Sequence, residues 1–158
     1  MTMRAPAERQ TLRSIGLVLL RVALGGLMVA AGVLKLRDPA GFAVEIANYQ
    51  LFPALSPYLA ATVPAVELVL GMGLLFLPAA WRRAAAGGAA LLLTMFTVAV
   101  CAAYLRDINI ACGCFGGGGD AIGPLTLARN VSLLGAVAIL LAFDGRGPNA
   151  RDHVHVPS

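Results

Sequence analysis

The sequence predicts an all-α membrane protein, a bundle of four transmembrane helices with a short interfacial helix between the first two spans. Hydrophobic residues make up 59% of the chain and charged residues 13%, whereas soluble domains are about half apolar and about a quarter charged. A membrane-spanning helix needs about 20 apolar residues, and four stretches approach or exceed that length. They cover residues 15–34, 58–78, 84–105 and 125–143.

The four spans form one domain at residues 14–144, with polar tails at 1–13 and 145–158. We expect the C-terminal tail to be disordered, despite two histidines that alternate with valines. The first apolar run is longer than the core of a signal peptide, so we interpret it as a span. The net charge of +4 comes from arginines scattered at helix ends, which argues against a nucleic-acid surface.

The basic residues predict the orientation of the chain, because short loops rich in Lys and Arg stay in the cytoplasm. Seven lie in the two tails and the second loop: Arg4, Arg9, Arg13, Arg82, Arg83, Arg146 and Arg151. Three lie in the other two loops: Lys35, Arg37 and Arg106. We therefore expect a bacterial inner-membrane protein with both termini in the cytoplasm and the loop of Cys112 and Cys114 on the extracytoplasmic side.

The first span is rich in small residues, which let another helix approach closely. They include Gly25, Gly26, Ala30 and Gly32. The segment after it is too polar to span a membrane, and Pro39 suits the start of a helix. Three residues beyond it share one helical face: Phe42, Ile46 and Tyr49. This pattern predicts a helix at 40–50 in the outer interface, the alternative being an irregular loop.

The second span carries Glu67 near its middle, after Pro64, and neighbouring helices tolerate such a proline inside a membrane. The third span has aromatic residues at both ends, where their rings favour the headgroup region. The fourth span brings Arg129 and Asn130 within two turns of its outer end. With Arg21 in the first span, charged side chains are thus expected in three of the four spans.

Cys112 and Cys114 give the sharpest chemical signal. They lie one residue apart at the head of a glycine run, and Gly113 supplies the backbone freedom to close a small disulfide ring. Such a ring is strained, and strained, exposed disulfides are more oxidising and exchange more readily than structural ones. The pattern therefore predicts a redox pair that exchanges with a partner's thiols.

Other roles for the cysteines stay open. A structural disulfide is common outside the cytoplasm, although closing so short a loop adds little stability through chain entropy. Metal binding is a weaker reading, because three cysteines without a histidine outside the tail fall short of a four-ligand zinc site. Cys101 either joins a thiol relay with the loop pair or is a small buried hydrophobe, and the second role is the more common.

Charged side chains inside a membrane need partners. At 1.5 Å per residue, Glu67 lies about 13 Å below the outer end of its helix and Arg129 about 6 Å below the end of its own. An arginine side chain covers most of that difference, and Arg21 approaches Glu67 from the cytoplasmic side. Either arginine could form a structural ion pair with Glu67, or Arg129 could stabilise a loop thiolate.

The sequence also resembles a known family of membrane proteins. "RVALGGLMVAAGVLKLRDPAGFAVEIANYQLFP" followed by "PAVELVLGMGLL" is similar to the DoxX-type pattern, and "INIACGCFG" followed by "IGPLTLARN" resembles the MauE branch of MauE/DoxX redox-associated membrane proteins. The resemblance extends over nearly all of residues 14–143. It implies a four-helix protein that assists disulfide formation in exported partners, as MauE does for the disulfide-rich small subunit of methylamine dehydrogenase.

Carried over by this resemblance, Cys112 and Cys114 are the redox pair, and Glu67, Arg129 and Asn130 are family-like polar positions. The implied function is thiol-disulfide exchange with an extracytoplasmic thioredoxin-like protein or a disulfide-containing client. If the chain is an enzyme, it is then a thiol-disulfide oxidoreductase.

How the cysteine pair is reset is open, and no cofactor motif is evident. A quinone in the outer leaflet near Arg129 and Tyr104 is a natural electron acceptor. The alternative function is a non-catalytic DoxX-like membrane subunit or assembly factor of a quinone-linked oxidase or dehydrogenase. A third is a small-solute carrier that uses Glu67 and Arg21, for which four helices would have to pair in a homodimer through their small-residue faces.

Overall fold

A computed structural model describes residues 6–108 and 123–143, which form five α-helices and one short 3-10 helix. These elements are α1 (Pro6–Arg37), α2 (Pro39–Asn48), η1 (Pro53–Leu55), α3 (Ser56–Phe76), α4 (Ala79–Leu105) and α5 (Pro124–Phe143). Four of the helices are long and apolar enough to cross a membrane. The predicted all-α fold with four spans is confirmed, and the chain is a multi-pass membrane protein.

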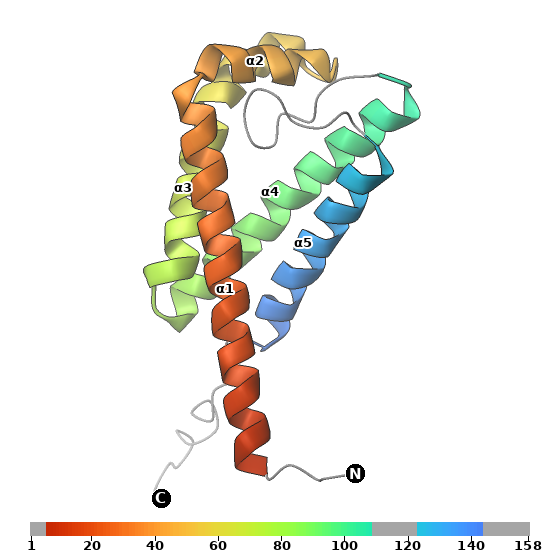
Figure 1. Cartoon of the computed structure of the whole chain (residues 1–158). Helices are drawn as coiled ribbons and strands as arrows, with labels where there is room; N and C mark the ends of the chain where they lie inside the picture. The colour runs from red at the N-terminus through yellow and green to blue at the C-terminus, as the bar shows by residue number, and fades with distance from the viewer. Residues whose placement is uncertain (1–5, 109–122, 144–158) are drawn as a thin grey trace, which may run out of the picture.

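The long helices alternate in direction and pack as two antiparallel pairs, α1 with α3 and α4 with α5 (Figure 1). α3 also packs against α4, and α1 contacts α5. α2 lies across one end of the bundle, where α1 and α4 end and α3 and α5 begin (Figure 1). Residues 109–122, which contain Cys112 and Cys114, connect α4 to α5 at this end, and they lie outside the described residues.

α1 begins earlier than the span predicted at residues 15–34. Its 32 residues measure about 48 Å at 1.5 Å per residue, more than the roughly 30 Å of a bilayer's hydrocarbon core. The extra turns are polar. They reach the last residue of α5, where the Arg13 guanidinium lies 4.6 Å from the centre of the Phe143 ring. Apolar length defines a span, and a helix continues beyond it wherever its backbone hydrogen bonds continue.

The predicted short helix between the first two spans is confirmed as α2. Asp38 caps it, since the backbone N–H of Gly41 donates to the Asp38 carboxylate at 2.9 Å, and Pro39 occupies its first turn. Only Asp38 separates α2 from α1, so the chain turns sharply onto the end of the bundle. Phe42 of α2 is 4% exposed, which shows that α2 turns an aromatic residue into the bundle.

α1 and α3 approach each other closely at their glycines. A Cβ atom on Gly25 would lie 2.8 Å from Cγ of Leu75 and 3.0 Å from the carbonyl oxygen of Gly71. A Cβ on Gly32 would lie 2.9 Å from the carbonyl oxygen of Pro64. Contacts this close leave no room for a Cβ atom at either glycine, so small residues are what let these two backbones meet.

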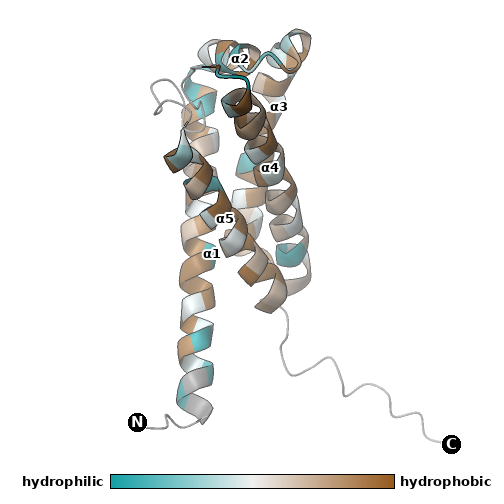
Figure 2. Ribbon diagram, turned by 90° about the vertical axis from the view of Figure 1, so that its right-hand side faces the viewer, coloured by the Kyte–Doolittle hydropathy of each residue, from teal (hydrophilic) through white to brown (hydrophobic). Residues whose placement is uncertain are grey.

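The outer surface of the bundle is apolar. Figure 2 shows hydrophobic colouring along α4 and α5, and several large hydrophobic side chains are largely exposed, among them Leu105 (80%) and Leu125 (77%). A patch of this extent would be unusual on a soluble monomer. The hydrocarbon of the membrane covers this apolar surface. Because no water is excluded when the helices pack there, their association depends on how closely their surfaces fit.

The close contact of α1 with α3 gives a matched pair of tests. We expect Gly25→Val to lower the free energy of unfolding by about 1–3 kcal/mol, because the new side chain must push α3 away. Gly26→Val is the control, since a Cβ at Gly26 meets nothing within 4 Å. Unfolding of both variants in detergent, followed by circular dichroism, checks this; equal stability of the two would contradict the packing described.

Candidate functional site

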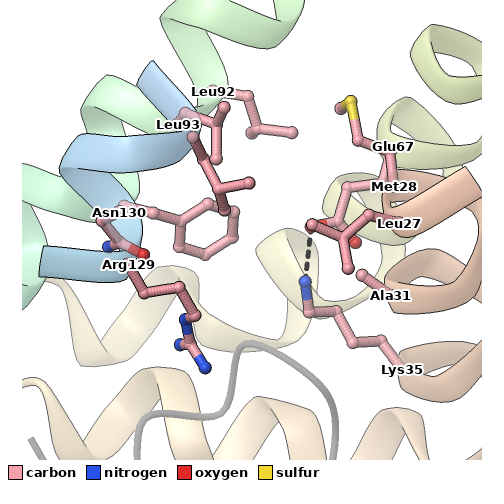
Figure 3. Close-up of a pocket in the computed structure, with 11 residues that line it drawn as sticks. Leu27, Met28, Ala31, Lys35, Glu67, Leu92, Leu93, Arg129 and Asn130 are labelled. Carbon is pink, nitrogen blue, oxygen red and sulfur yellow. Dashed lines mark hydrogen bonds and ion pairs between the residues drawn. The ribbon is translucent and has the colours of Figure 1, made fainter. Parts of the chain in front are cut away.

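A buried ion pair joins Lys35 of α1 to Glu67 of α3 (Figure 3). The ammonium of Lys35 donates a hydrogen bond to Oε1 of Glu67. Lys35 is 1% exposed and Glu67 is 5% exposed, so neither charge is solvated by water. Each is tolerated because the other neutralises it. The pair therefore holds α1 and α3 together inside the bundle.

The sequence predicted that Arg129 or Arg21 would pair with Glu67. This prediction is wrong, because the partner is Lys35. The error comes from counting depth along the backbone, since side chains on a helix lean toward its N-terminus. α1 and α3 are antiparallel, so Lys35 leans inward from the end of α1 while Glu67 leans toward the α2 end. The two meet inside the bundle, and the lysine does not extend outward to the headgroups as a terminal lysine commonly does.

Two aromatic rings complete the surroundings of the Lys35 ammonium. Its Nζ lies 5.2 Å from the centre of the Phe42 ring and 4.9 Å from that of the Phe96 ring. Both distances are within the range of cation–π attraction. Because Phe42 belongs to α2 and Phe96 to α4, one lysine of α1 contacts groups on three other helices.

A cavity of about 60 Å³ lies beside the ion pair. α5 lines it with Arg129 and Asn130, and Figure 3 shows Arg129 extending from α5 into the space that Lys35 faces from α1. Asn130 is 3% exposed. Within the described residues, Oε2 of Glu67 and the side-chain nitrogen of Asn130 are buried without a hydrogen-bond partner. Buried polar atoms are nearly always satisfied, so this cavity is suited to water or a small polar group.

The structure brings together three of the predicted site residues, Glu67, Arg129 and Asn130, around this cavity. Arg21 does not line it; fourteen residues before Lys35 on the same helix, it lies about 21 Å away along the axis. Cys101 is a partly buried free cysteine of α4. In the part of the chain that is described, no cluster of three or more His, Cys, Asp or Glu could hold a metal ion.

The sequence analysis missed Lys35, which it counted only as a topology signal. One feature distinguishes it: it is the sole lysine of a chain with eleven arginines. Among the described residues, it lines the cavity together with two other charged side chains, those of Glu67 and Arg129.

The predicted redox pair, Cys112 and Cys114, lies outside the described residues, so its geometry relative to the cavity stays a prediction. What the structure does describe is the two helix ends from which that segment departs. α4 ends at Leu105 and α5 begins at Pro124, five residues before Arg129. The cysteines are therefore tethered to the end of the bundle that holds the cavity.

Comparison with known proteins gives a consistent result. The family described as methylamine utilisation protein MauE matches residues 13–143. The methylamine utilization protein MauE of Paracoccus denitrificans is 36% identical over 126 residues, which are 78% of this chain and 66% of that protein. The chain thus spans just under two thirds of this relative. No solved structure matches the chain. Both matches are to MauE proteins, and the DoxX part of the resemblance stays a prediction.

The buried ion pair predicts a specific pattern of stability. Lys35→Met should lower the free energy of unfolding by about 3–5 kcal/mol, because it leaves a carboxylate buried without its partner. The double variant Lys35→Met/Glu67→Leu should recover most of that loss, since no charge is then stranded. Equilibrium unfolding in detergent measures all three proteins.

Arg37→Met is the control for this series, because it removes a positive charge from an exposed position two residues further along α1. It should change stability by less than about 1 kcal/mol. If the double variant were as unstable as Lys35→Met, the ion pair would not be the reason for the loss.

Proposed function

Because the chain belongs to the MauE family, we propose that it is a membrane component of thiol-disulfide exchange that promotes disulfide formation in exported proteins of methylamine utilisation. The name of its Paracoccus relative, a methylamine utilization protein, supports the physiological setting. One observation supports the chemistry: the segment with Cys112 and Cys114 joins α4 to α5 at the end of the bundle where Lys35 and Arg129 line a small cavity.

The proposal places this end of the bundle on the extracytoplasmic side of the inner membrane. The beginning of α1 and the connection between α3 and α4 share the opposite end (Figure 1). That end carries the larger number of basic residues, including Arg82 and Arg83, and basic segments favour the cytoplasm. Cys112 and Cys114 then face the compartment in which disulfides form and persist.

The proposed exchange has two steps. A thiolate of the partner, either a thioredoxin-like protein or the client itself, attacks one sulfur of the Cys112–Cys114 disulfide; the other sulfur leaves as a thiolate, and a mixed disulfide forms. The partner's second thiolate then attacks the mixed disulfide. The partner leaves with a new disulfide, and the loop pair has gained two electrons and, on protonation, two protons.

In this proposal, the cavity beside the Lys35–Glu67 pair has a role in both steps. Each releases a thiolate from the loop pair, and positive charge nearby stabilises that leaving group. Arg129 and Lys35 supply this charge, while Glu67 holds Lys35 in place and the amide of Asn130 offers a hydrogen bond. Arg129 is the more direct of the two cations, since it stands on the second turn of α5, close in sequence to the loop.

The loop pair must be oxidised again before another cycle. We propose that a membrane quinone accepts its two electrons and two protons, so that a dithiol and a quinone become a disulfide and a quinol. This acceptor is soluble in the same membrane as the bundle and needs no protein-bound metal.

The central test is the reduction potential of the Cys112/Cys114 pair. Membranes are equilibrated with defined thiol buffers, and free thiols are trapped with a membrane-impermeant maleimide that adds mass. We expect reversible behaviour above roughly −230 mV, the range of exchange proteins, whereas structural disulfides fall below about −300 mV. Labelling from outside intact spheroplasts also tests the predicted orientation.

Cys101→Ala is the matched control and should leave the potential unchanged. A pair that resists reduction across this range, or that never forms a disulfide, would contradict catalysis and favour a non-catalytic membrane subunit. Arg129→Met should slow alkylation of the reduced pair at neutral pH, and Arg129→Lys should restore it in part because the charge returns.

A further inference from the structure

A second and larger cavity lies at the same end of the bundle. It is a groove of about 370 Å³ between α2, the first turns of α3 and the second half of α4. Its rim carries exposed apolar side chains, including Phe52 (66%), Met95 (56%) and Val98 (61%). Since these side chains face outward from the bundle, the groove opens toward the hydrocarbon of the membrane. A volume of this size suits the headgroup and first tail units of a small lipid-like ligand.

The walls of the groove are aromatic where it meets α2 and α4. Phe42, Tyr49 and Phe96 all line it, and aromatic rings pack well against a flat ring in stacked or edge-on arrangements. The position of the groove in the membrane also suits an amphiphilic ligand, because α2 lies across the end of the bundle (Figure 1). A ligand in it would have its head near the membrane surface and its tail along α3 and α4.

Among the described residues, one carboxylate lines the groove, that of Glu45 of α2. Its Oε2 is buried and, among the described residues, has no hydrogen-bond partner. Burial raises the pKa of Glu45, the charge of Lys35 opposes this shift, and Asp38 adds to it. The carboxyl group can therefore accept a hydrogen bond when ionised and donate one when protonated, at a pH closer to neutral than for an exposed glutamate.

The lining residues favour an uncharged ligand over a phospholipid headgroup, and the nearby guanidinium of Arg106 already donates to the backbone carbonyl of Tyr49 at 3.3 Å. No Lys, Arg or His lines the groove in the described part of the chain, although a phosphate group would need such a partner. Glu45 would instead repel a phosphate. The ligand is thus an uncharged amphiphile with a flat polar ring and an apolar tail.

From these features we infer that the groove binds an isoprenoid quinone or its quinol, with the ring between Phe42 and Phe96 and a ring oxygen hydrogen-bonded to Glu45. The inference deepens the proposed function, on which it rests for the ligand's redox role. Binding itself requires no cysteine, so the two proposals can fail separately. Neither Arg129 nor Tyr104, the residues near which the sequence suggested a quinone, lines this groove.

The groove and the cavity beside the Lys35–Glu67 pair share a wall. Phe96 and Leu92 line both, and the rings of Phe42 and Phe96 contact the ammonium of Lys35. The bound ring would therefore be one layer of side chains away from the Lys35–Glu67 pair. This places the proposed electron acceptor beside the charge cluster to which the cysteine segment is tethered.

Photolabelling tests the inference directly. The full-length protein in phosphatidylcholine nanodiscs is exposed to a photoactivatable short-chain benzoquinone, and labelled peptides are identified by mass spectrometry. We expect saturable labelling of α2 and α4 that an unlabelled decyl-benzoquinone displaces. Equal displacement by phosphatidylglycerol would show a general lipid site, and labelling spread evenly over the helices would show no site; either result overturns the inference.

Two variants probe the groove, one from α4 and one from α2. Ala99→Phe fills it from α4 and should reduce saturable labelling at least tenfold, whereas Ala61→Phe makes the same change at an exposed position on α3 outside the groove. Glu45→Leu removes the hydrogen bond and should weaken quinone binding by about tenfold. Unchanged labelling in both groove variants, when both elute as folded protein, contradicts the site.

The double variant Cys112→Ser/Cys114→Ser separates the two proposals. It should bind the quinone as well as the unmodified protein does. If quinone binds but the cysteine pair behaves as a structural disulfide, the proposed exchange fails and the groove stands. If the pair exchanges thiols but no quinone binds, the groove assignment fails and another oxidant must reset the pair.

Discussion

The requirement that charge inside a membrane be neutralised organises this protein. Lys35 and Glu67 are both almost fully buried, and neither would be tolerated there without the other. Meeting that requirement ties four helices together, because the ammonium of Lys35 also lies against Phe42 of α2 and Phe96 of α4. The glycine contacts between α1 and α3 serve the same end, since they bring the two backbones close enough for the pair to form.

The ion pair also explains why one end of the bundle differs from the other. At the α2 end, the cavity beside the ion pair and the larger groove share Phe96, which lines both. The cavity holds the charges suited to a thiolate, and the groove has the shape and polarity suited to a quinone. The cysteine segment starts and finishes at this same end. The proposed redox segment, the charged residues and the proposed quinone groove are thus all connected to this one end of the bundle.

Much of the fold could be predicted from the sequence, because apolar length and helix-start signals are local properties. The four spans and the capped helix after Asp38 follow from them. The partner of Glu67 could not, since it depends on the direction in which side chains lean between antiparallel helices. The groove was also beyond reach: its walls come from three helices, and Glu45 looks like an ordinary surface residue in the sequence. The assignment of Cys112 and Cys114 as a redox pair rests on the sequence alone.

The most direct test of this account joins its two halves in one anaerobic experiment. The purified protein is reduced, freed of reductant and given a short-chain benzoquinone, and the loop thiols are trapped with maleimide over time while quinol is measured by its absorbance. The account predicts that the Cys112/Cys114 disulfide forms with one quinol produced for each disulfide, and that Ala99→Phe slows both together. Thiols that stay reduced in the presence of bound quinone would contradict it.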